Sequence, residues 1–307
     1  MCGRTCCTLS PEVMPFACTT LTGSKTPIWR EAPDGGKYFP ANNIPPSRYT
    51  PVLWRTGSNP RDLTLQPMLW GFIPPWHRGE VPTKHGLTTN NARLEGLGES
   101  KLYKAALSQN RRCVVVADGF YEWKKLDGSG SKQPYLVYAP QENGPIESCP
   151  DIQLVDGWSA ATGWTGPRPL FMAGIYSIWE NAVGQEVFSY SIITRESNEV
   201  FNWLHHRVPA ILSNPKEVDQ WLDPELKGDE ALKVLIPLIK TQLTWHPVSP
   251  DVGNVRNQSP GLQKPVPLDV KGKAKDTKSG SASLMSNWLK KAAKPNKDEP
   301  DTKKSKP

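Results

Sequence analysis

Apolar side chains occur along this chain in short runs, which clusters of glycine, proline and asparagine interrupt. Short apolar runs bounded by turn-forming residues are typical of β-strands. The four clearest runs cover residues 113–117, 135–138, 170–179 and 187–194. A glycine- and serine-rich stretch at 127–131 predicts a hairpin connection between the first two runs. The body of the chain is therefore expected to consist mainly of strands.

Helical patterns are fewer and cover three segments. Residues 99–107 place apolar side chains on one face, which predicts an amphipathic helix. A second helix is predicted over 215–222, because Asn214 can cap it and Pro215 suits its first position. A third is predicted over 229–240, although a proline within it would interrupt the helix.

Two further stretches lack the periodicity of a helix or strand. The polar insertion at 140–169 is predicted to be a surface loop. Past about residue 265 the composition shifts to lysine, serine, proline and aspartate, which predicts disorder. One apolar island at 284–289 could fold as a short helix on a partner, or could be a chance cluster. Its apolar side chains are Leu284, Met285, Trp288 and Leu289.

The charge of the chain is concentrated at its C-terminal end. Residues 271–307 hold 11 lysines and 4 acidic residues, so their net charge is 11 − 4 = +7. The remaining 26 basic and 26 acidic side chains balance. A neutral body argues against wholesale wrapping of a polyanion, so any nucleic-acid contact by the body requires a local basic groove.

The cysteine spacings show no zinc-binding pattern, so neither a structural metal nor a cofactor is expected. The six cysteines are Cys2, Cys6, Cys7, Cys18, Cys113 and Cys149. The chain has no hydrophobic signal region and no apolar run long enough to span a membrane. We therefore expect a soluble protein of a reducing compartment, without membrane contact.

Cys2 is the residue with the most distinctive chemistry. Loss of Met1 would leave a cysteine that carries a free α-amine beside its thiol. Such a pair condenses with an aldehyde first as an imine, and the sulfur then closes a five-membered thiazolidine. Both groups titrate near neutrality, the amine at about 7.7 to 8 and the thiol at about 8.5. The alternative is an ordinary cysteine at a frayed terminus.

An aromatic segment at 70–76 is stiffened by prolines and could stack on nucleobases. For Trp70, core packing is the better explanation. Trp76 follows two prolines and precedes the polar His77, so it is predicted to be exposed.

Three other segments carry polar groups that strands and turns do not need. Asn91 and Arg93 would share one face of an extended segment and suit a sugar and a phosphate, although a lone arginine is commonly just solvated. Glu122 follows a buried strand, and burial would raise its pKa and make it a proton acceptor near neutrality; the alternative is a solvated edge residue. Of His205 and His206, only one can point into any given pocket. A histidine titrates in the range useful for imine chemistry.

Six motifs in this chain stand in the order and spacing of the SRAP family, which the chain therefore resembles. They are CGR, WGFIPPW, NAR, DGFYEW, HHRVPAIL and WHPVSPDVGNVRNQ. The resemblance covers residues 2–262 and leaves 263–307 as a lysine-rich tail. It implies an α+β fold in which curved antiparallel sheets form a barrel-like core with flanking helices. It also implies capture of the aldehyde of an abasic site in single-stranded DNA as a thiazolidine crosslink, which shields the lesion during replication.

The resemblance further implies a role for each matching residue. Cys2 would be the crosslinking nucleophile after removal of Met1, which could be autocatalytic. Asn91 would hold the terminal amine and the sugar. Glu122 would be the base that activates the amine and assists reversal, and His205 would be the acid that protonates the sugar oxygen. This amounts to a lyase-like crosslinking activity.

The resemblance also implies a set of DNA-binding residues. Arginines would hold the flanking phosphates, and aromatic side chains would stack on or wedge between bases. The residues are Arg4, Asn43, Trp76, His77, Arg93, Trp123 and Arg207. His77 replaces a second tryptophan of bacterial members, so the wedge is expected to be smaller. Val208 replaces a methionine of vertebrate members, which changes packing only.

The tail island resembles a degenerate sliding-clamp motif without its leading glutamine, so a clamp is a candidate partner. The DNA substrate and the basic tail lead us to expect a monomeric nuclear protein at replication forks. Two alternatives stay open from the residues. One is an N-terminal-nucleophile amidohydrolase, because glutamine amidotransferases also begin Met-Cys-Gly. The other is a non-catalytic reader of modified DNA.

Overall fold

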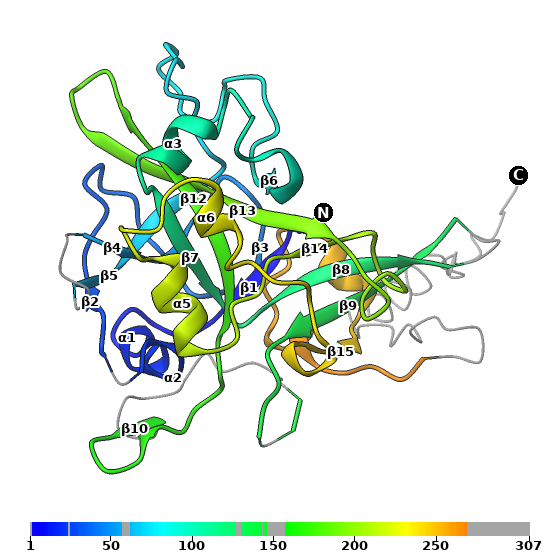
Figure 1. The fold of residues 1–307 in the computed structure, drawn as a ribbon. Coiled ribbons are helices and arrows are strands. Elements are labelled where there is room, and N and C mark those ends of the chain that lie inside the picture. The colour runs from blue at the N-terminus through cyan, green and yellow to red at the C-terminus, as the bar shows by residue number, and fades with distance from the viewer. Residues whose placement is uncertain are drawn as a thin grey trace, which may run out of the picture. The chain divides into compact units, whose positions relative to one another are not determined.

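A computed structural model describes residues 2–23, 25–56, 62–126, 130–142, 144–145 and 157–268. All of these belong to one compact unit, which Figure 1 shows as a ribbon. Its strands are β1 (Thr5–Cys7), β2 (Ile28–Trp29), β3 (Ala41–Ile44), β4 (Tyr49–Arg55), β5 (Leu63–Trp70), β6 (Asn91–Arg93), β7 (Arg112–Ala117), β8 (Gly119–Lys125), β9 (Lys132–Tyr138), β10 (Trp158–Ser159), β11 (Gly163–Trp164), β12 (Leu170–Glu180), β13 (Glu186–Glu196), β14 (Arg207–Pro209) and β15 (Thr244–Pro247). Its α-helices are α1 (Met14–Ala17), α2 (Thr19–Thr22), α3 (Lys104–Ser108), α5 (Pro215–Trp221) and α6 (Asp229–Leu232). Its 3-10 helices are η1 (Leu94–Gly96), η2 (Lys240–Gln242), η3 (Pro250–Gly253) and η4 (Pro260–Gln263).

Five long strands form a closed barrel. β5, β4, β7, β12 and β13 pair with their neighbours in antiparallel fashion. The ring closes where β13 pairs in parallel with β5, with Tyr190 opposite Trp70. Closure removes the unpaired edges that an open sheet would expose. The four apolar runs of the sequence lie in β7, β9, β12 and β13, which confirms the strand predictions.

Strand β7 shows why those apolar runs are uninterrupted. Val114 and Val116 point into one buried cluster, while Cys113 and Val115 point into another. Because successive side chains of a strand face opposite ways, a strand with both faces buried is apolar at every position. α5 and α2 pack together and cover the first of these clusters (Figure 1).

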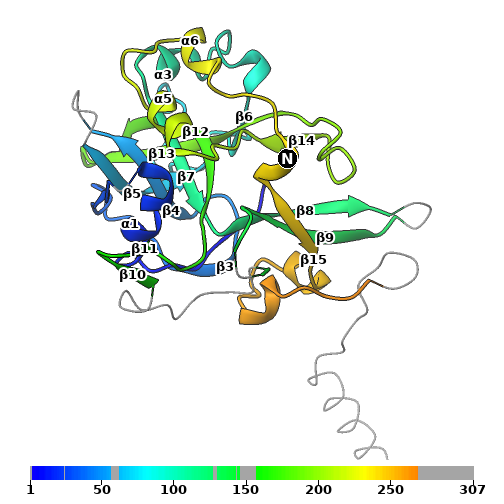
Figure 2. The same cartoon turned by 60° about the horizontal axis from the view of Figure 1, so that its bottom comes forward.

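A second sheet has the strand order β15-β9-β8-β1-β3 and carries the start of the chain. In Figure 2 its β8–β9 hairpin extends from the barrel, with β15 alongside β9. The chain passes from β7 in the barrel to β8 in this sheet through Asp118, whose carboxylate accepts hydrogen bonds from the Thr8 backbone N–H and hydroxyl at 2.9 and 2.6 Å. Gly119 follows because a Cβ there would lie 2.5 Å from the Val137 carbonyl oxygen.

The structure corrects three sequence predictions. The stretch at 127–131 connects β8 to β9 rather than β7 to β9, because the mixed polar and aromatic β8 was not recognised as a strand. The predicted helix at 99–107 is only α3, which starts at Lys104. The predicted helix at 229–240 ends at Leu232, and Pro237, which cannot donate a helical hydrogen bond, keeps the chain from forming a helix through 240.

The polar insertion at 140–169 contains the short strand pair β10 and β11, which the sequence did not predict. The tail island and Cys149 lie outside the described residues, so the predictions about them stay predictions. The chain is described as far as residue 268, and Gln263, just past the predicted boundary of the body, is fully buried.

Helix α5 has the predicted N-terminal cap, and this gives a stability prediction. The Asn214 side chain accepts a 3.0 Å hydrogen bond from Glu217 N, and the Glu217 carboxylate accepts one from Ser213 N at 2.7 Å. We expect Asn214→Ala to lower the free energy of unfolding by about 1 kcal/mol, as measured by chemical denaturation. Lys216→Ala, an exposed change on the same helix, should alter it by less than about 0.5 kcal/mol. Equal values for the two variants would contradict a stabilising cap.

Candidate active site at the start of the chain

The start of the chain lies beside β6, β8 and β14 (Figures 1 and 2). Cys2 is 1% exposed and packs in the buried cluster that also contains Cys113 and Val115. Its carbonyl oxygen accepts hydrogen bonds from Asn91 Nδ2 at 2.7 Å and Asn90 Nδ2 at 3.2 Å. Residue 2 is therefore a fixed part of the core, and the alternative of a frayed terminus does not apply to it.

Asn91 reaches Cys2 because β6 pairs in parallel with β13, which is part of the barrel wall. The extended backbone buries Ala92 completely and leaves Asn91 and Arg93 on the other face, as the sequence predicted. Asn91 Oδ1 is buried and accepts no hydrogen bond from any residue in the described part of the chain. An amide oxygen in this position can accept a hydrogen bond from an amine.

Glu122 lies on β8 and is only 5% exposed. Burial raises the pKa of Glu122 above its ordinary value, while the positive amino terminus, the Trp123 backbone N–H and the charge of His206 act in the opposite direction. A carboxylate with a raised pKa beside a chain terminus is suited to exchange protons with an amine near neutral pH.

The surroundings of the Cys2 thiol disfavour its charged form. Burial raises the pKa of Cys2 well above its ordinary value, and the negative charge of Glu122 raises it further. The amino-terminal charge and a hydrogen bond from the Arg4 backbone oppose these effects. The same carboxylate therefore acts on the thiol and on the terminal amine.

His205 and His206 lie together just before β14, with ring centroids 4.4 Å apart. Arg207 N donates to His205 Nδ1 at 3.0 Å, which orients that ring. Burial lowers the pKa of His205, and the amino-terminal charge adds to the effect. His206 is exposed and lines a cavity of about 370 Å³ together with Arg93, Ser197, Asn202, Glu196 and Arg207.

The predicted phosphate-binding arginines have different environments. Arg93 is exposed beside this cavity. Arg207 is 5% exposed and forms a bidentate ion pair with Glu95 at 3.0 and 2.9 Å. The guanidinium of Arg207 is thus occupied by Glu95 and borders the cavity wall, so Arg93 is the more accessible of the two.

Arg4 has partners on three sides. Its Nη1 donates to Asn43 Oδ1 at 2.7 Å and to the Val252 carbonyl oxygen at 2.8 Å, and its guanidinium lies 5.7 Å from the ring centroid of Trp123. Asn43 is fully buried, and its Nδ2 donates to the carbonyl oxygens of residues 252, 254 and 257 at 3.1, 3.0 and 3.1 Å. Asn43 therefore connects the late NVRNQ motif to the strand beside the chain start.

The aromatic residues separate as the sequence predicted. Trp70 is fully buried and stacks on Tyr190 with centroids 6.5 Å apart, whereas Trp76 is 52% exposed. His77 lies on the same loop as Trp76, and its ring centroid is 5.5 Å from that of Trp179. Trp76 is thus free to meet a ligand, and His77 packs against the barrel.

Three residues near the site were given no role by the sequence analysis. Asn90 shares the carbonyl of Cys2 with Asn91, and its own carbonyl accepts from Trp70 Nε1 at 3.0 Å. Glu95 holds Arg207, and His206 acts electrostatically on Glu122. The Asn90–Asn91 doublet and the His205–His206 doublet were visible signals, but the distant partner of Glu95 was not.

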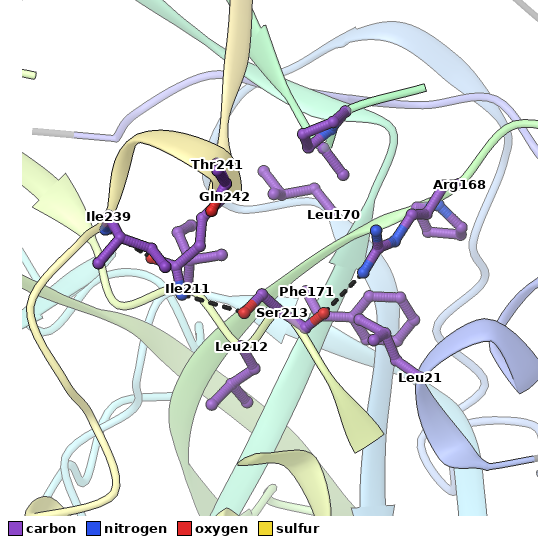
Figure 3. A pocket seen from close by; sticks show the side chains of 13 residues that line it. Leu21, Arg168, Leu170, Phe171, Ile211, Leu212, Ser213, Ile239, Thr241 and Gln242 are labelled. Carbon is purple, nitrogen blue, oxygen red and sulfur yellow. Dashed lines mark hydrogen bonds between the residues drawn. The ribbon is translucent and has the colours of Figure 1, made fainter. Parts of the chain in front are cut away.

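A different cavity of about 200 Å³, shown in Figure 3, lies between α2, β12 and the segment around η2. Arg168 Nη2 donates to the Ser213 carbonyl oxygen at 2.6 Å, and Gln242 Nε2 donates to Ser213 Oγ at 3.0 Å. The rest of its wall is largely apolar, with Leu21, Phe171 and Ile211 among the lining side chains. The Ser213 hydroxyl also donates to Glu217 Oε2 at 3.1 Å, but that carboxylate accepts from Ser213 N as part of the α5 cap, so this pair has a structural role.

Among the residues that the structure describes, no three His, Cys, Asp or Glu side chains are grouped so that they could hold a metal ion. None of the helices in the described ranges is both long and apolar enough to cross a membrane.

Comparison with known proteins gives a consistent family match. The family model described as SOS response associated peptidase (SRAP) matches residues 1–255. The abasic site processing protein HMCES of Xenopus tropicalis is 40% identical over 313 residues, which cover 97% of this chain and 88% of that protein. HMCES of Rattus norvegicus is 38% identical and covers 99% of this chain and 86% of its own length. The abasic site processing protein YoqW of Bacillus subtilis (strain 168) is 31% identical over 229 residues, 74% of this chain and 87% of its own length.

Solved structures share the fold. A crystal structure of a Bacteroides thetaiotaomicron protein superimposes with a TM-score of 0.59 at 21% identity, covering 85% of this chain and 96% of that one. A Bordetella bronchiseptica protein superimposes with a TM-score of 0.57 at 19% identity, covering 81% and 100%. These neighbours, together with the closed barrel, confirm the predicted α+β fold class.

Proposed function

The chain belongs to the SRAP family, and from this premise we propose that it processes abasic sites in single-stranded DNA by forming a thiazolidine crosslink through Cys2. Its relatives are named abasic site processing proteins. The observation that carries the proposal is the position of Cys2, fixed by Asn91 and electrostatically coupled to Glu122. Removal of Met1, by the protein itself or by another enzyme, places the free amine among these groups.

The environment of Cys2 orders the two bond-forming steps. Because the thiol is held neutral by its raised pKa, the amine is the first group to attack the open-chain aldehyde. The carbinolamine then loses water and becomes a cationic imine. That positive charge favours ionisation of the adjacent thiol, whose sulfur attacks the imine carbon while its proton leaves. The product ring contains both the nitrogen and the sulfur of Cys2, and one water has been released.

Neighbouring side chains supply the proton transfers. Asn91 Oδ1, which has no partner among the described residues, can accept a hydrogen bond from the amine and orient its lone pair. Glu122 takes the proton of the terminal ammonium, returns it to the carbinolamine hydroxyl as this group leaves as water, and then takes the proton that the thiol releases. Closure of the thiazolidine removes the cationic imine that promotes strand cleavage, so the crosslink shields the lesion.

A nuclear location at replication forks, a monomeric state and a sliding-clamp partner of the tail are parts of the same proposal.

DNA binding in this proposal uses exposed side chains around the site. Arg93 beside the 370 Å³ cavity suits a flanking phosphate, and the exposed Trp76 suits stacking on a base. The Arg4 guanidinium, which packs on Trp123 and is partly exposed, is a second candidate for a phosphate contact. An abasic sugar has no base to unstack, so it can leave the strand and approach Cys2 at little cost.

The proposal is tested with purified protein and a single-stranded oligonucleotide that carries one abasic site. After denaturation, a slower-migrating species should form with this strand and not with the intact strand. Its mass should equal the protein without Met1 plus the DNA minus one water. An adduct that retains Met1 would contradict the proposal. Release of ammonia from glutamine in place of an adduct would favour an amidohydrolase.

The histidine pair gives a separate prediction. His205→Ala should slow crosslinking at saturating DNA by about 100-fold, because a positioned acid typically contributes 10² or more. His206→Ala should chiefly weaken DNA binding, since His206 lines the cavity. Single-turnover rates across DNA concentrations separate the two effects. Since the pKa of His205 is lowered, the His205-dependent part of the rate should increase as the pH falls. If His206→Ala instead slows the rate at saturating DNA and His205→Ala chiefly weakens binding, the acid is His206.

A further inference from the structure

A groove of about 440 Å³ lies between residues 37–49 and the loop that contains Val255 and Gln258. Two cationic side chains, Lys37 and Arg48, and two aromatic ones, Phe39 and Tyr49, line it. Its described lining contains no carboxylate. In a body whose charges balance, a local excess of positive charge next to aromatic rings is a distinctive feature.

The side chains of this groove are arranged for contact with a ligand. Phe39 is 72% exposed, although burial would stabilise so large an apolar ring. Lys37 and Arg48 are also exposed. An exposed ring flanked by cations is the combination that binds single-stranded nucleic acid, because bases stack on the ring and phosphates pair with the cations.

The wall of the groove is rigid. Tyr49 donates a hydrogen bond from its hydroxyl to Asp34, and its ring packs so close to Gly36 that a Cβ there would lie 2.1 Å from Cε1. Ser47 has a φ of 67°, a left-handed conformation that is unusual for serine. Its N–H donates to the Trp70 carbonyl oxygen at 2.8 Å, which anchors the loop to the barrel. The groove is thus formed before any ligand binds.

Hydrogen bonds connect the wall of the groove to the segment that carries Cys2, through the fully buried Asn43. Asn43 lines the groove and accepts a hydrogen bond from Arg4. The Arg4 carbonyl oxygen in turn accepts from Tyr121 N, next to Glu122. The groove therefore lies next to the segment that carries Cys2 and Arg4.

Building on the proposed function, we propose that this groove binds the single strand on one side of the lesion. A base on that side stacks on Phe39, and the adjoining phosphates pair with Lys37 and Arg48. The groove extends the DNA-binding surface away from Cys2 and takes no part in the bond-forming steps.

The test uses the full chain and a tetrahydrofuran abasic analogue, which has no aldehyde and reports non-covalent binding. Strands extended by about ten nucleotides on the 5′ side only, on the 3′ side only, or on neither side are compared by fluorescence anisotropy. Phe39→Ala should weaken binding about fivefold to tenfold for one extended strand and leave the other two unchanged. Lys37→Ala/Arg48→Ala should reduce the slope of log affinity against log salt by about 1.4 for that same strand.

Matched controls carry equivalent changes away from the groove. Val183→Ala removes an apolar side chain that is 78% exposed, and Lys104→Ala/Lys216→Ala removes two exposed charges. Neither control variant should change the affinity for any of the three oligonucleotides. If the groove variants bind all strands as the wild type does, or lose affinity equally for both extensions, the inference is overturned. If the wild type captures no true abasic strand, the proposed function fails instead, so the two failures are distinguishable.

Discussion

Cys2→Ser protein should form no DNA adduct that survives denaturation, under conditions in which the wild type converts an abasic single strand to a crosslinked species. Serine leaves a residue small enough for Met1 removal and keeps the α-amine in place. It replaces sulfur by a hydroxyl oxygen, which is a much weaker nucleophile. The imine can therefore form, but the stable ring cannot, and the imine hydrolyses when the protein is denatured. The expected effect is complete loss of the band on a denaturing gel.

Borohydride separates the roles of the two atoms. Because it reduces the imine to a stable amine, the Cys2→Ser protein should be trapped on the abasic strand when borohydride is present. Insertion of an alanine between Met1 and Cys2 moves the free amine to the inserted residue. The amine and the thiol are then no longer on neighbouring carbons, so this variant should give no adduct without the reductant. Cys18→Ala, a change at another buried cysteine in a separate core cluster, should leave crosslinking intact. A stable adduct from the insertion variant would show that a 1,2-aminothiol is not required.

The strands of the barrel could be predicted because they are buried on both faces. Val114 and Val115 face different clusters, so the sequence shows a continuous apolar run. β8 lacks such a run: Glu122 and Trp123 follow Tyr121 within one strand, and propensity alone does not identify it. The hairpin was therefore assigned to the wrong strand pair.

The sequence singled out residues that the structure brings together, but it did not indicate how they pair. The family motifs gave Cys2 and Asn91, which lie in direct contact. Arg207 was expected to bind phosphate, yet its partner Glu95 lies 112 residues away in the sequence, and no local pattern indicates that ion pair. Asn43 likewise meets Val252 across 209 residues. Such contacts depend on the closure of the barrel and on the order of the second sheet, which are long-range properties.

Glu122→Gln should slow crosslinking by about 100-fold or more at neutral pH, because a positioned general base typically contributes 10² to 10⁴. Glutamine keeps the size and most hydrogen bonds of the buried side chain but cannot accept a proton. Single-turnover rates on an abasic strand give the measurement. Glu180→Gln, an exposed change at the end of β12, serves as the control and should react at the wild-type rate. A wild-type rate for Glu122→Gln would remove this carboxylate from the mechanism.

The pH dependence of Glu122 distinguishes a base from a structural residue. Because burial raises its pKa, the wild-type rate should increase with pH through a midpoint above the ordinary carboxyl range, and Glu122→Gln should lack that increase. The free energy of unfolding should change with pH in the opposite direction to the rate. A raised pKa means that the folded protein binds more protons than the unfolded chain between the two pKa values, so the free energy of unfolding of the wild type should fall as pH rises across this interval. Denaturant unfolding at a series of pH values should show this fall in the wild type and not in Glu122→Gln. A buried carboxylate that charges during catalysis thus lowers stability in the pH range in which it becomes reactive, and parallel profiles of the two proteins would contradict that coupling.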